Sequence, residues 1–246
     1  MNPSTKKIKH PFLLAASLIL ILSIAFCAWY LTDYYHAHQD AISAFSADFE
    51  IPVQQPDDRT TVYIPENPSA GLIFYPGGKV EAEAYEPLLL SCARDGILCV
   101  LVEMPFRLAV LDVDAAEGIP EQFPQIREWY LAGHSLGGSM AASFAAENAP
   151  DYRGLVLLGS YSTADLSDTG VEVLSIYGSE DRVMNLEKYE KYRSNLPETF
   201  SEIILEGGCH AYFGVYGPQE GDGIPTITNA EQITRTAEAI VELTRD

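Results

Sequence analysis

The chain has 246 residues, of which 47% are hydrophobic, and it contains 18 glycines and 15 prolines. This composition is typical of a globular protein with one main domain and excludes a fibrous or a disordered chain. Three lysines precede residue 11, and from residue 33 onward 35 acidic residues face only 12 basic ones, a formal charge of −23. So acidic a surface repels a phosphate backbone, which excludes nucleic acid as a partner.

The first predicted element is a membrane-spanning helix at residues 11–31. This stretch contains no charged residue, and about 20 apolar residues in a helix cross a hydrocarbon core of roughly 30 Å. Lysines precede the stretch and Asp33 follows it. This asymmetry predicts that residues 1–10 are cytoplasmic and that the remainder is extracytoplasmic. We therefore expect a single-pass protein of the cell membrane.

A cleaved signal peptide is the alternative interpretation of the same segment. The apolar run is longer than the usual core of a signal peptide, and no small-x-small cleavage site follows it. Lipoprotein processing is also disfavoured, because Phe26 precedes Cys27 where a small residue is needed. The pattern favours an uncleaved signal-anchor, and in either case the domain lies outside the cytoplasm.

Residues 32–58 are polar and mixed, which predicts a juxtamembrane stalk before a catalytic domain at 59–246. In that domain short apolar runs alternate with segments of helix length, a pattern typical of a mostly parallel sheet with helices on both faces. The predicted strands are 61–64, 71–75, 97–104, 129–133, 155–159, 171–177 and 202–205. The predicted helices are 81–94, roughly 108–117, 136–148, 186–195 and 229–244.

The strongest motif is Gly133-His134-Ser135-Leu136-Gly137, which follows a predicted strand and opens a predicted helix. In a G-x-S-x-G turn the serine hydroxyl stands above the sheet, and the N-terminus of the following helix favours negative charge. The motif therefore predicts that Ser135 is a nucleophile.

The serine needs a base, and the chain has five histidines. His10 precedes the membrane helix, and His36 and His38 lie in the expected stalk. His134 is expected to point from its strand into the fold. Elimination leaves His210, which follows a predicted strand in a glycine-rich loop.

An acidic residue should orient the histidine, and Asp181 lies directly after the strand that ends at Tyr177. Glu180 is its neighbouring rival, and Asp165 and Asp168 in the preceding loop are further alternatives. With Asp181 the order along the chain is serine, aspartate, histidine, as is usual for this kind of nucleophile turn.

Acyl transfer also requires donors for an oxyanion. The backbone N–H of Leu136, next to the nucleophile, is one candidate. The other lies in Pro76-Gly77-Gly78-Lys79 after the strand 71–75, where we favour the N–H of Gly78 over that of Lys79. The glycine-rich segment 211–223 either walls a substrate pocket or packs its aromatic side chains onto the core. Candidate pocket residues are Lys79, His134, Tyr212 and Phe213.

No metal or other cofactor is expected. Glu220 and Asp222 lack the spacing of a calcium loop, and the chain has no CxxC or Cys/His cluster. An oxidising compartment would permit a Cys92–Cys99 disulfide, although the expected helix-to-strand placement disfavours it.

The motifs GHSLGG, GSEDRV and GGCH resemble signatures of the α/β-hydrolase superfamily, over residues 60–245. YPGGKV, VEMPF, WYLAGHSLGG and CHAYFGVYGPQEGDG more narrowly resemble a bacterial branch, the "alpha/beta hydrolase fold-5" proteins, many of which are predicted to be membrane-anchored. This resemblance implies the triad Ser135, Asp181 and His210. Cys209 departs from it, because asparagine is expected at that position.

We therefore expect a serine hydrolase that cleaves a carboxylic ester, with a small-molecule or envelope-derived substrate. The predicted strands 155–159 and 171–177 are too close for a large cap domain, so an accessible cleft is expected. Two alternatives stay open: an acyltransferase or peptidase acting on cell-envelope material, and a binding protein that keeps the fold without catalysis.

Overall fold

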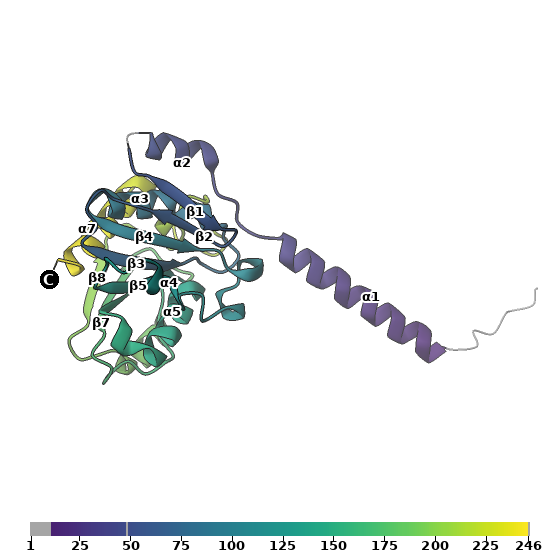
Figure 1. Ribbon diagram of the computed structural model, residues 1–246. Coiled ribbons are helices and arrows are strands. Elements are labelled where there is room, and N and C mark those ends of the chain that lie inside the picture. Colours follow the sequence, from purple (N-terminus) through teal and green to yellow (C-terminus); the bar gives the residue numbers. More distant parts are fainter. Residues whose placement is uncertain (1–10, 48, 246) are drawn as a thin grey trace, which may run out of the picture. The chain divides into compact units, whose positions relative to one another are not determined.

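The computed structural model of the protein describes residues 11–47 and 49–245 (Figure 1). The chain divides into two units, one that ends at Tyr34 and one that begins at Tyr35. The first unit contains the helix α1 (Pro11–Thr32), none of whose residues is buried. By length and composition α1 is able to cross a membrane.

The second unit is built on an eight-stranded sheet with the order β1-β2-β4-β3-β5-β6-β7-β8. Strands β3 to β8 run parallel to one another, whereas β2 is antiparallel to both β1 and β4. The predicted, mostly parallel sheet is therefore confirmed. The strands are β1 (Val53–Asp57), β2 (Thr60–Tyr63), β3 (Ala70–Tyr75), β4 (Ile97–Val102), β5 (Trp129–His134), β6 (Gly154–Leu158), β7 (Glu172–Gly178) and β8 (Ser201–Leu205).

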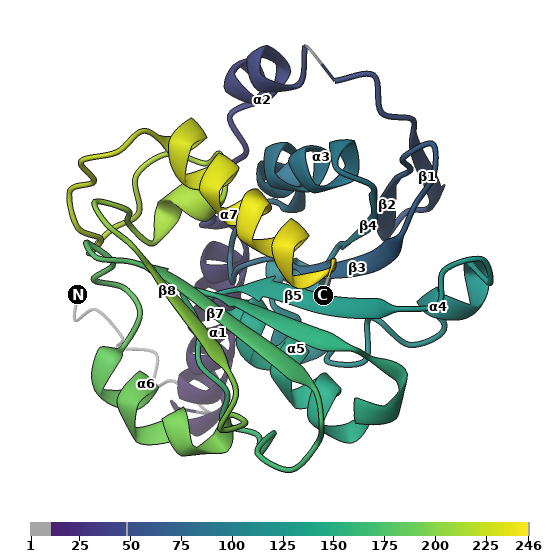
Figure 2. The same ribbon diagram turned by 90° about the vertical axis from the view of Figure 1, so that its left-hand side faces the viewer.

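Helices cover both faces of the sheet. Figure 2 shows α3 and α7 on one face and α5 on the other. Strand side chains alternate between the two sides: in β3, Phe74 packs in the core under α3 and α7, and Ile73 packs in the core under α5. Every residue of β3 to β6 is buried, which explains why these strands are continuously apolar in sequence. The helices of this unit are α2 (Gln39–Ser46), α3 (Glu86–Arg94), α4 (Ile119–Gln122), α5 (Leu136–Glu147), α6 (Leu186–Tyr192) and α7 (Asn229–Leu243).

Most of the segment expected to form a stalk is instead part of the compact unit. Residues 35–47 and 49–57 belong to the compact unit, in which α2 buries Ile42 and β1 extends the sheet. The Tyr35 N–H donates to the carbonyl of Lys79 (2.7 Å), and the Tyr35 carbonyl accepts from the N–H of Glu81 (3.0 Å). The unit begins at Tyr35 instead of residue 59 because this polar segment buries its few apolar side chains on the domain, which composition does not reveal.

The predicted helix at 108–117 is not formed. Only a short 3₁₀ turn, Ala109–Leu111, occurs there. The hydroxyl of Tyr75 donates to the carbonyl of Val113 (2.8 Å) and accepts from the N–H of Ala116 (2.9 Å). These tertiary bonds use backbone groups that a helix would have paired internally. Between β6 and β7, residues 159–171 contain neither helix nor strand, so this connection holds no cap domain.

Candidate active site

Ser135 lies on a strained turn between β5 and α5. Its backbone angles are φ 52° and ψ −121°, in a region that residues with a side chain rarely adopt. Its N–H donates to the carbonyl of Leu158 (2.9 Å), and its carbonyl accepts from the hydroxyl of Ser160 (2.7 Å). These bonds connect the turn to the end of β6 and stabilise a backbone conformation of the serine that is unfavourable by itself.

The glycines of the motif allow this turn to pack closely. A Cβ atom at Gly133 would lie 2.6 Å from the carbonyl carbon of Gly137, and one at Gly137 would overlap the carbonyl oxygens of Tyr75 and Pro76. Strand β5, helix α5 and the loop after β3 therefore meet at backbone contact distance, with Ser135 at their junction.

His210 and Asp181 form a buried hydrogen-bonded pair. The His210 Nδ1 atom lies 2.7 Å from Asp181 Oδ2. Asp181 Oδ1 accepts from the N–H groups of Val183 (2.9 Å) and Met184 (2.8 Å), so both carboxylate oxygens have partners. The His210 Nε2 atom and the Ser135 hydroxyl form no hydrogen bond within the described residues. The pair thus leaves one ring nitrogen of His210 unpaired.

Of the four acidic candidates, Asp181 is the one bonded to His210. Glu180 lies 3.8 Å from the guanidinium of Arg182. Asp165 accepts from the backbone and the hydroxyl of Ser167, bonds that hold its pKa below the usual value.

Gly159, at the end of β6, lies against this pair although no sequence motif marks it. Its φ is 51°, and a Cβ atom there would lie 2.9 Å from His210 Nδ1 and 3.0 Å from Asp181 Oδ2. Only glycine fits this position without moving the pair. The available signal is a glycine directly after a buried strand, at the carboxyl edge of the sheet.

Two further residues hold the backbone around His210. The buried Gln232 of α7 accepts from the N–H of Cys209 (3.0 Å) and donates to the Cys209 carbonyl (2.8 Å). Asp222 accepts from the N–H groups of His210 (3.2 Å) and Ala211 (2.9 Å). Burial and the nearby Asp222 raise the pKa of the Cys209 thiol to about 12, so this thiol stays protonated.

The candidate oxyanion donors lie together. A Cβ atom at Gly78 would lie 3.0 Å from Leu136 Cδ2, and within the described part of the chain neither backbone N–H donates a hydrogen bond. The N–H of Gly77 donates to the hydroxyl of Tyr85 (3.0 Å), and that of Lys79 donates to the carbonyl of Arg107 (2.8 Å). Gly78 therefore keeps a free N–H in this loop, whereas Lys79, the alternative donor, does not.

The candidate pocket residues fall into two groups. Lys79, with φ 60°, and Tyr212 are partly exposed. Phe213 and His134 are buried in the interior, and their rings lie 5.5 Å apart. Burial, and to a lesser degree the nearby His210, hold the pKa of His134 well below its usual value. His134 points into the fold, as expected, and its ring centroid lies 4.5 Å from that of His210.

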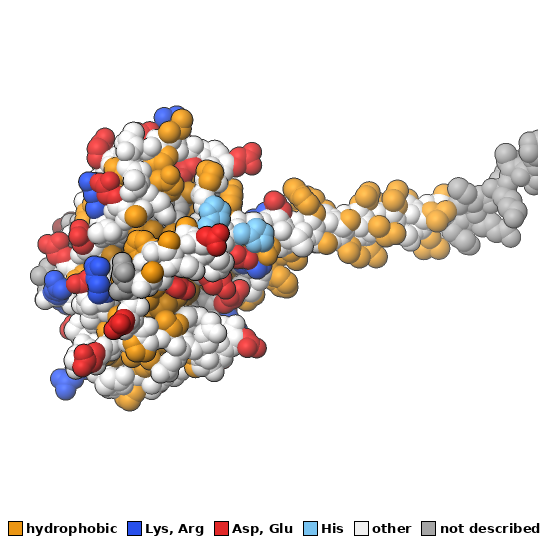
Figure 3. Space-filling view, turned by 90° about the horizontal axis from the view of Figure 1, so that it is seen from above, with side chains coloured by type: hydrophobic (Ala, Val, Ile, Leu, Met, Phe, Trp, Pro, Cys, Tyr) orange, Lys and Arg blue, Asp and Glu red, His pale blue; other side chains and the backbone are white. Residues whose placement is uncertain are grey.

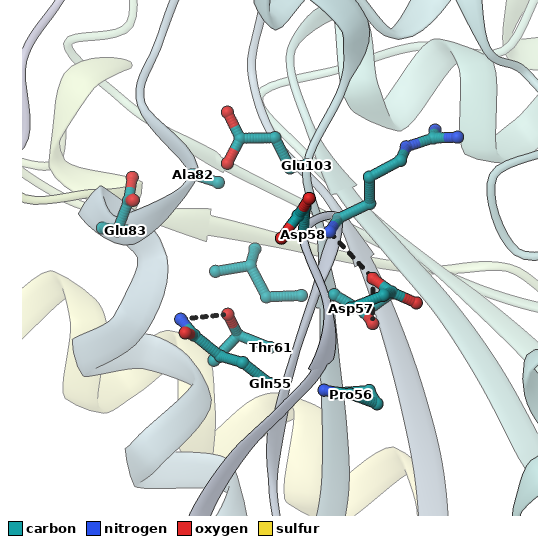
Figure 4. A pocket seen from close by; sticks show the side chains of 11 residues that line it. Gln55, Pro56, Asp57, Asp58, Thr61, Ala82, Glu83 and Glu103 are labelled. Carbon is teal, nitrogen blue, oxygen red and sulfur yellow. Dashed lines mark hydrogen bonds between the residues drawn. The ribbon is translucent and has the colours of Figure 1, made fainter.

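The remaining features of the sequence are the cysteine pair and the acidic surface of the domain. Cys92 and Cys99 are buried free thiols, without a disulfide between them. Acidic side chains are spread over the face of the domain in Figure 3. A hollow of about 450 Å³ beside the β1–β2 turn is lined partly by Asp57, Asp58, Glu83 and Glu103 (Figure 4). Burial and the neighbouring carboxylates raise the pKa of Glu103. This hollow contains none of the candidate catalytic residues.

The sheet order, the helices on both faces and a serine turn at the carboxyl end of β5 define the class of α/β-hydrolase folds. The family model described as "Alpha/beta hydrolase family" matches residues 71–234, more than half of the chain, and the chain belongs to that family.

Solved structures of similar fold include TT1662 from Thermus thermophilus and Est1E from Butyrivibrio proteoclasticus. TT1662 is 19% identical with a TM-score of 0.59, and Est1E is 14% identical with a TM-score of 0.57. Each comparison covers 80% of this chain and 99% of the other chain. No curated protein matches the sequence.

Proposed function

We propose that the protein is a serine hydrolase that cleaves a carboxylic ester through an acyl-enzyme at Ser135. The observation that carries the proposal is the buried His210–Asp181 pair, bonded at 2.7 Å through Nδ1, which leaves Nε2 without a hydrogen-bond partner within the described residues. A carboxylate on Nδ1 fixes the tautomer in which Nε2 accepts a proton, and it stabilises the imidazolium that forms.

The reaction proceeds in two steps. His210 Nε2 takes the hydroxyl proton of Ser135 as Oγ bonds to the ester carbonyl carbon, and the N–H groups of Leu136 and Gly78 stabilise the oxyanion. Collapse of this intermediate breaks the bond to the alkoxide, which leaves as an alcohol with the proton from His210. Water then attacks the acyl-enzyme by the same route, which releases the acid and restores the serine.

The proposal is tested with p-nitrophenyl esters of graded chain length. Ser135→Ala is expected to lower kcat by about 10⁴-fold or more, because the nucleophile is lost. Ser143→Ala is the matched control: its hydroxyl only bonds back to the Ser139 carbonyl on the same helix (3.1 Å), so hydrolysis should be unchanged. Hydrolysis by the Ser135→Ala protein at the parental rate would refute the mechanism.

We also propose that α1 is an uncleaved membrane anchor and that the domain lies outside the cytoplasm. The support is its apolar length together with Lys6, Lys7 and Lys9 before it.

A further inference from the structure

A tyrosine and a histidine form a buried hydrogen-bonded pair beside the candidate triad. Tyr85 ends the 3₁₀ helix Ala82–Tyr85, and His134 is the last residue of β5. The Tyr85 hydroxyl lies 2.7 Å from His134 Nδ1, and it also accepts the N–H of Gly77 at 3.0 Å. Exposed fractions of 0% for Tyr85 and 1% for His134 show that water does not compete for these bonds.

The direction of these bonds follows from the protons available. Tyr85 has one hydroxyl proton, and its oxygen already accepts from Gly77. Within the described residues the only acceptor that the hydroxyl meets is His134 Nδ1. Donation from the hydroxyl to Nδ1 uses this proton and places the ring proton of His134 on Nε2, which has no partner within the described residues. Burial raises the pKa of Tyr85 and lowers that of His134, so both groups stay neutral.

Both ends of this chain of bonds touch the proposed machinery. Gly77 directly precedes Gly78, whose N–H is the proposed oxyanion donor. A Cβ atom at Gly77 would lie 2.7 Å from both the Tyr85 hydroxyl and His134 Nδ1, so the loop is seated tightly on the pair. At the other end, the ring of His134 lies 4.5 Å from that of His210, at 47°.

We propose that Tyr85 and His134 are positioning residues for the oxyanion loop: the Tyr85 hydroxyl, oriented by His134, fixes the Gly77 peptide and thereby aims the N–H of Gly78. This inference rests on the proposed serine hydrolase function. Gly78 has no side chain and no hydrogen bond of its own in the described residues, so its orientation depends on its neighbours. His134 also supports one face of the His210 ring without placing a second positive charge beside the imidazolium.

The test is Tyr85→Phe, which removes the hydroxyl and keeps the ring. Tyr189→Phe is the matched control, because Tyr189 is also a buried tyrosine, with its hydroxyl bonded to Ser175 (3.0 Å) and Glu202 (3.1 Å). We expect Tyr85→Phe to lower kcat on a p-nitrophenyl ester about 10- to 100-fold with KM within about twofold, because an oxyanion donor acts in the transition state. Tyr189→Phe should keep the parental kcat. A Tyr85→Phe protein that loses thermal stability and keeps kcat would overturn the inference.

If Tyr85→Phe does not fold, a second pair of variants tests whether the Tyr85–His134 bond positions the oxyanion loop. His134→Asn keeps an acceptor near the position of Nδ1, whereas His134→Leu has none. We expect the asparagine variant to retain kcat within about threefold and the leucine variant to lose at most the roughly 10- to 100-fold in kcat expected for Tyr85→Phe, because His134 acts through Tyr85. Equal kcat values for the two would overturn the inference. Ester hydrolysis that survives Ser135→Ala would instead refute the proposed function, so the two failures are distinguishable.

Discussion

His134 is an ionisable residue in the interior whose charge state matters for the whole site. Its ring contacts Tyr85 and His210, and burial keeps its pKa well below the ordinary value of 6.5. A proton on this ring would place a positive charge against the proposed general base. The site therefore depends on an environment that keeps His134 neutral.

This environment makes stability depend on pH. Below about pH 6.5 the unfolded chain protonates His134 and the folded protein does not, so the free energy of unfolding falls by up to about 1.4 kcal/mol per pH unit. Above that pH His134 is neutral in both states, so its protonation no longer lowers the free energy of unfolding. His134→Asn removes this titration. Urea unfolding at pH 8 and pH 5 is therefore expected to show a stability difference between parent and variant that narrows at the lower pH. A difference that stays constant would contradict the assigned pKa direction.

At the residue scale, the sequence indicates the candidate catalytic groups but not the residues that position them. Ser135 is recognisable from its motif and His210 by elimination among five histidines. Gly159, Tyr85 and Gln232 have no such signature. Their roles arise from contacts between segments distant in the chain, such as the bond between Gln232 and Cys209.

Helix α7 connects packing to the candidate site. Its apolar face buries Ile233, Ala237 and Ile240 against the sheet. The same face carries Gln232, whose amide bonds both backbone groups of Cys209, the residue before His210. The C-terminal helix therefore fixes the loop that holds the histidine.

Gln232→Met keeps the approximate size of the side chain and removes both bonds. The unpaired backbone groups of Cys209 should cost about 1–3 kcal/mol of unfolding free energy. We expect kcat for ester hydrolysis to fall about tenfold or more, because small displacements of a catalytic group are costly. Thr236→Val, on the same face and bonded only to the Gln232 carbonyl, is the control and should retain kcat. If Gln232→Met lowered stability alone, α7 would have no part in placing His210.

At the scale of elements, the buried strands are the most predictable feature, because short, continuously apolar runs such as 71–75 are typical of strands covered on both faces. The segment 108–117 behaves differently. Its sequence pattern favours a helix, but the helix does not form because the Tyr75 hydroxyl bonds two of its backbone groups, a tertiary contact that no local pattern encodes. Strand β1 (Val53–Asp57) escapes prediction because all of its residues are exposed and one of them is proline.

The whole molecule combines an apolar helix with a strongly acidic domain. If α1 is an anchor, the full chain should stay in the membrane pellet after alkaline carbonate extraction. This treatment disrupts contacts between proteins but does not extract a helix that spans the lipid bilayer. A chain beginning at Tyr35, where the compact unit starts, should be soluble and should hydrolyse the same esters. Recovery of the full chain in the soluble fraction would contradict the anchor.

The central claim is that Ser135 is the nucleophile of a hydrolase. Its most direct test is reaction of the intact protein with a fluorophosphonate, followed by mass spectrometry of the labelled peptide. A stoichiometric label on Ser135, lost in Ser135→Ala and strongly slowed in His210→Ala, is the predicted result. Labelling of another residue, or no labelling of a protein that still hydrolyses esters, would contradict it.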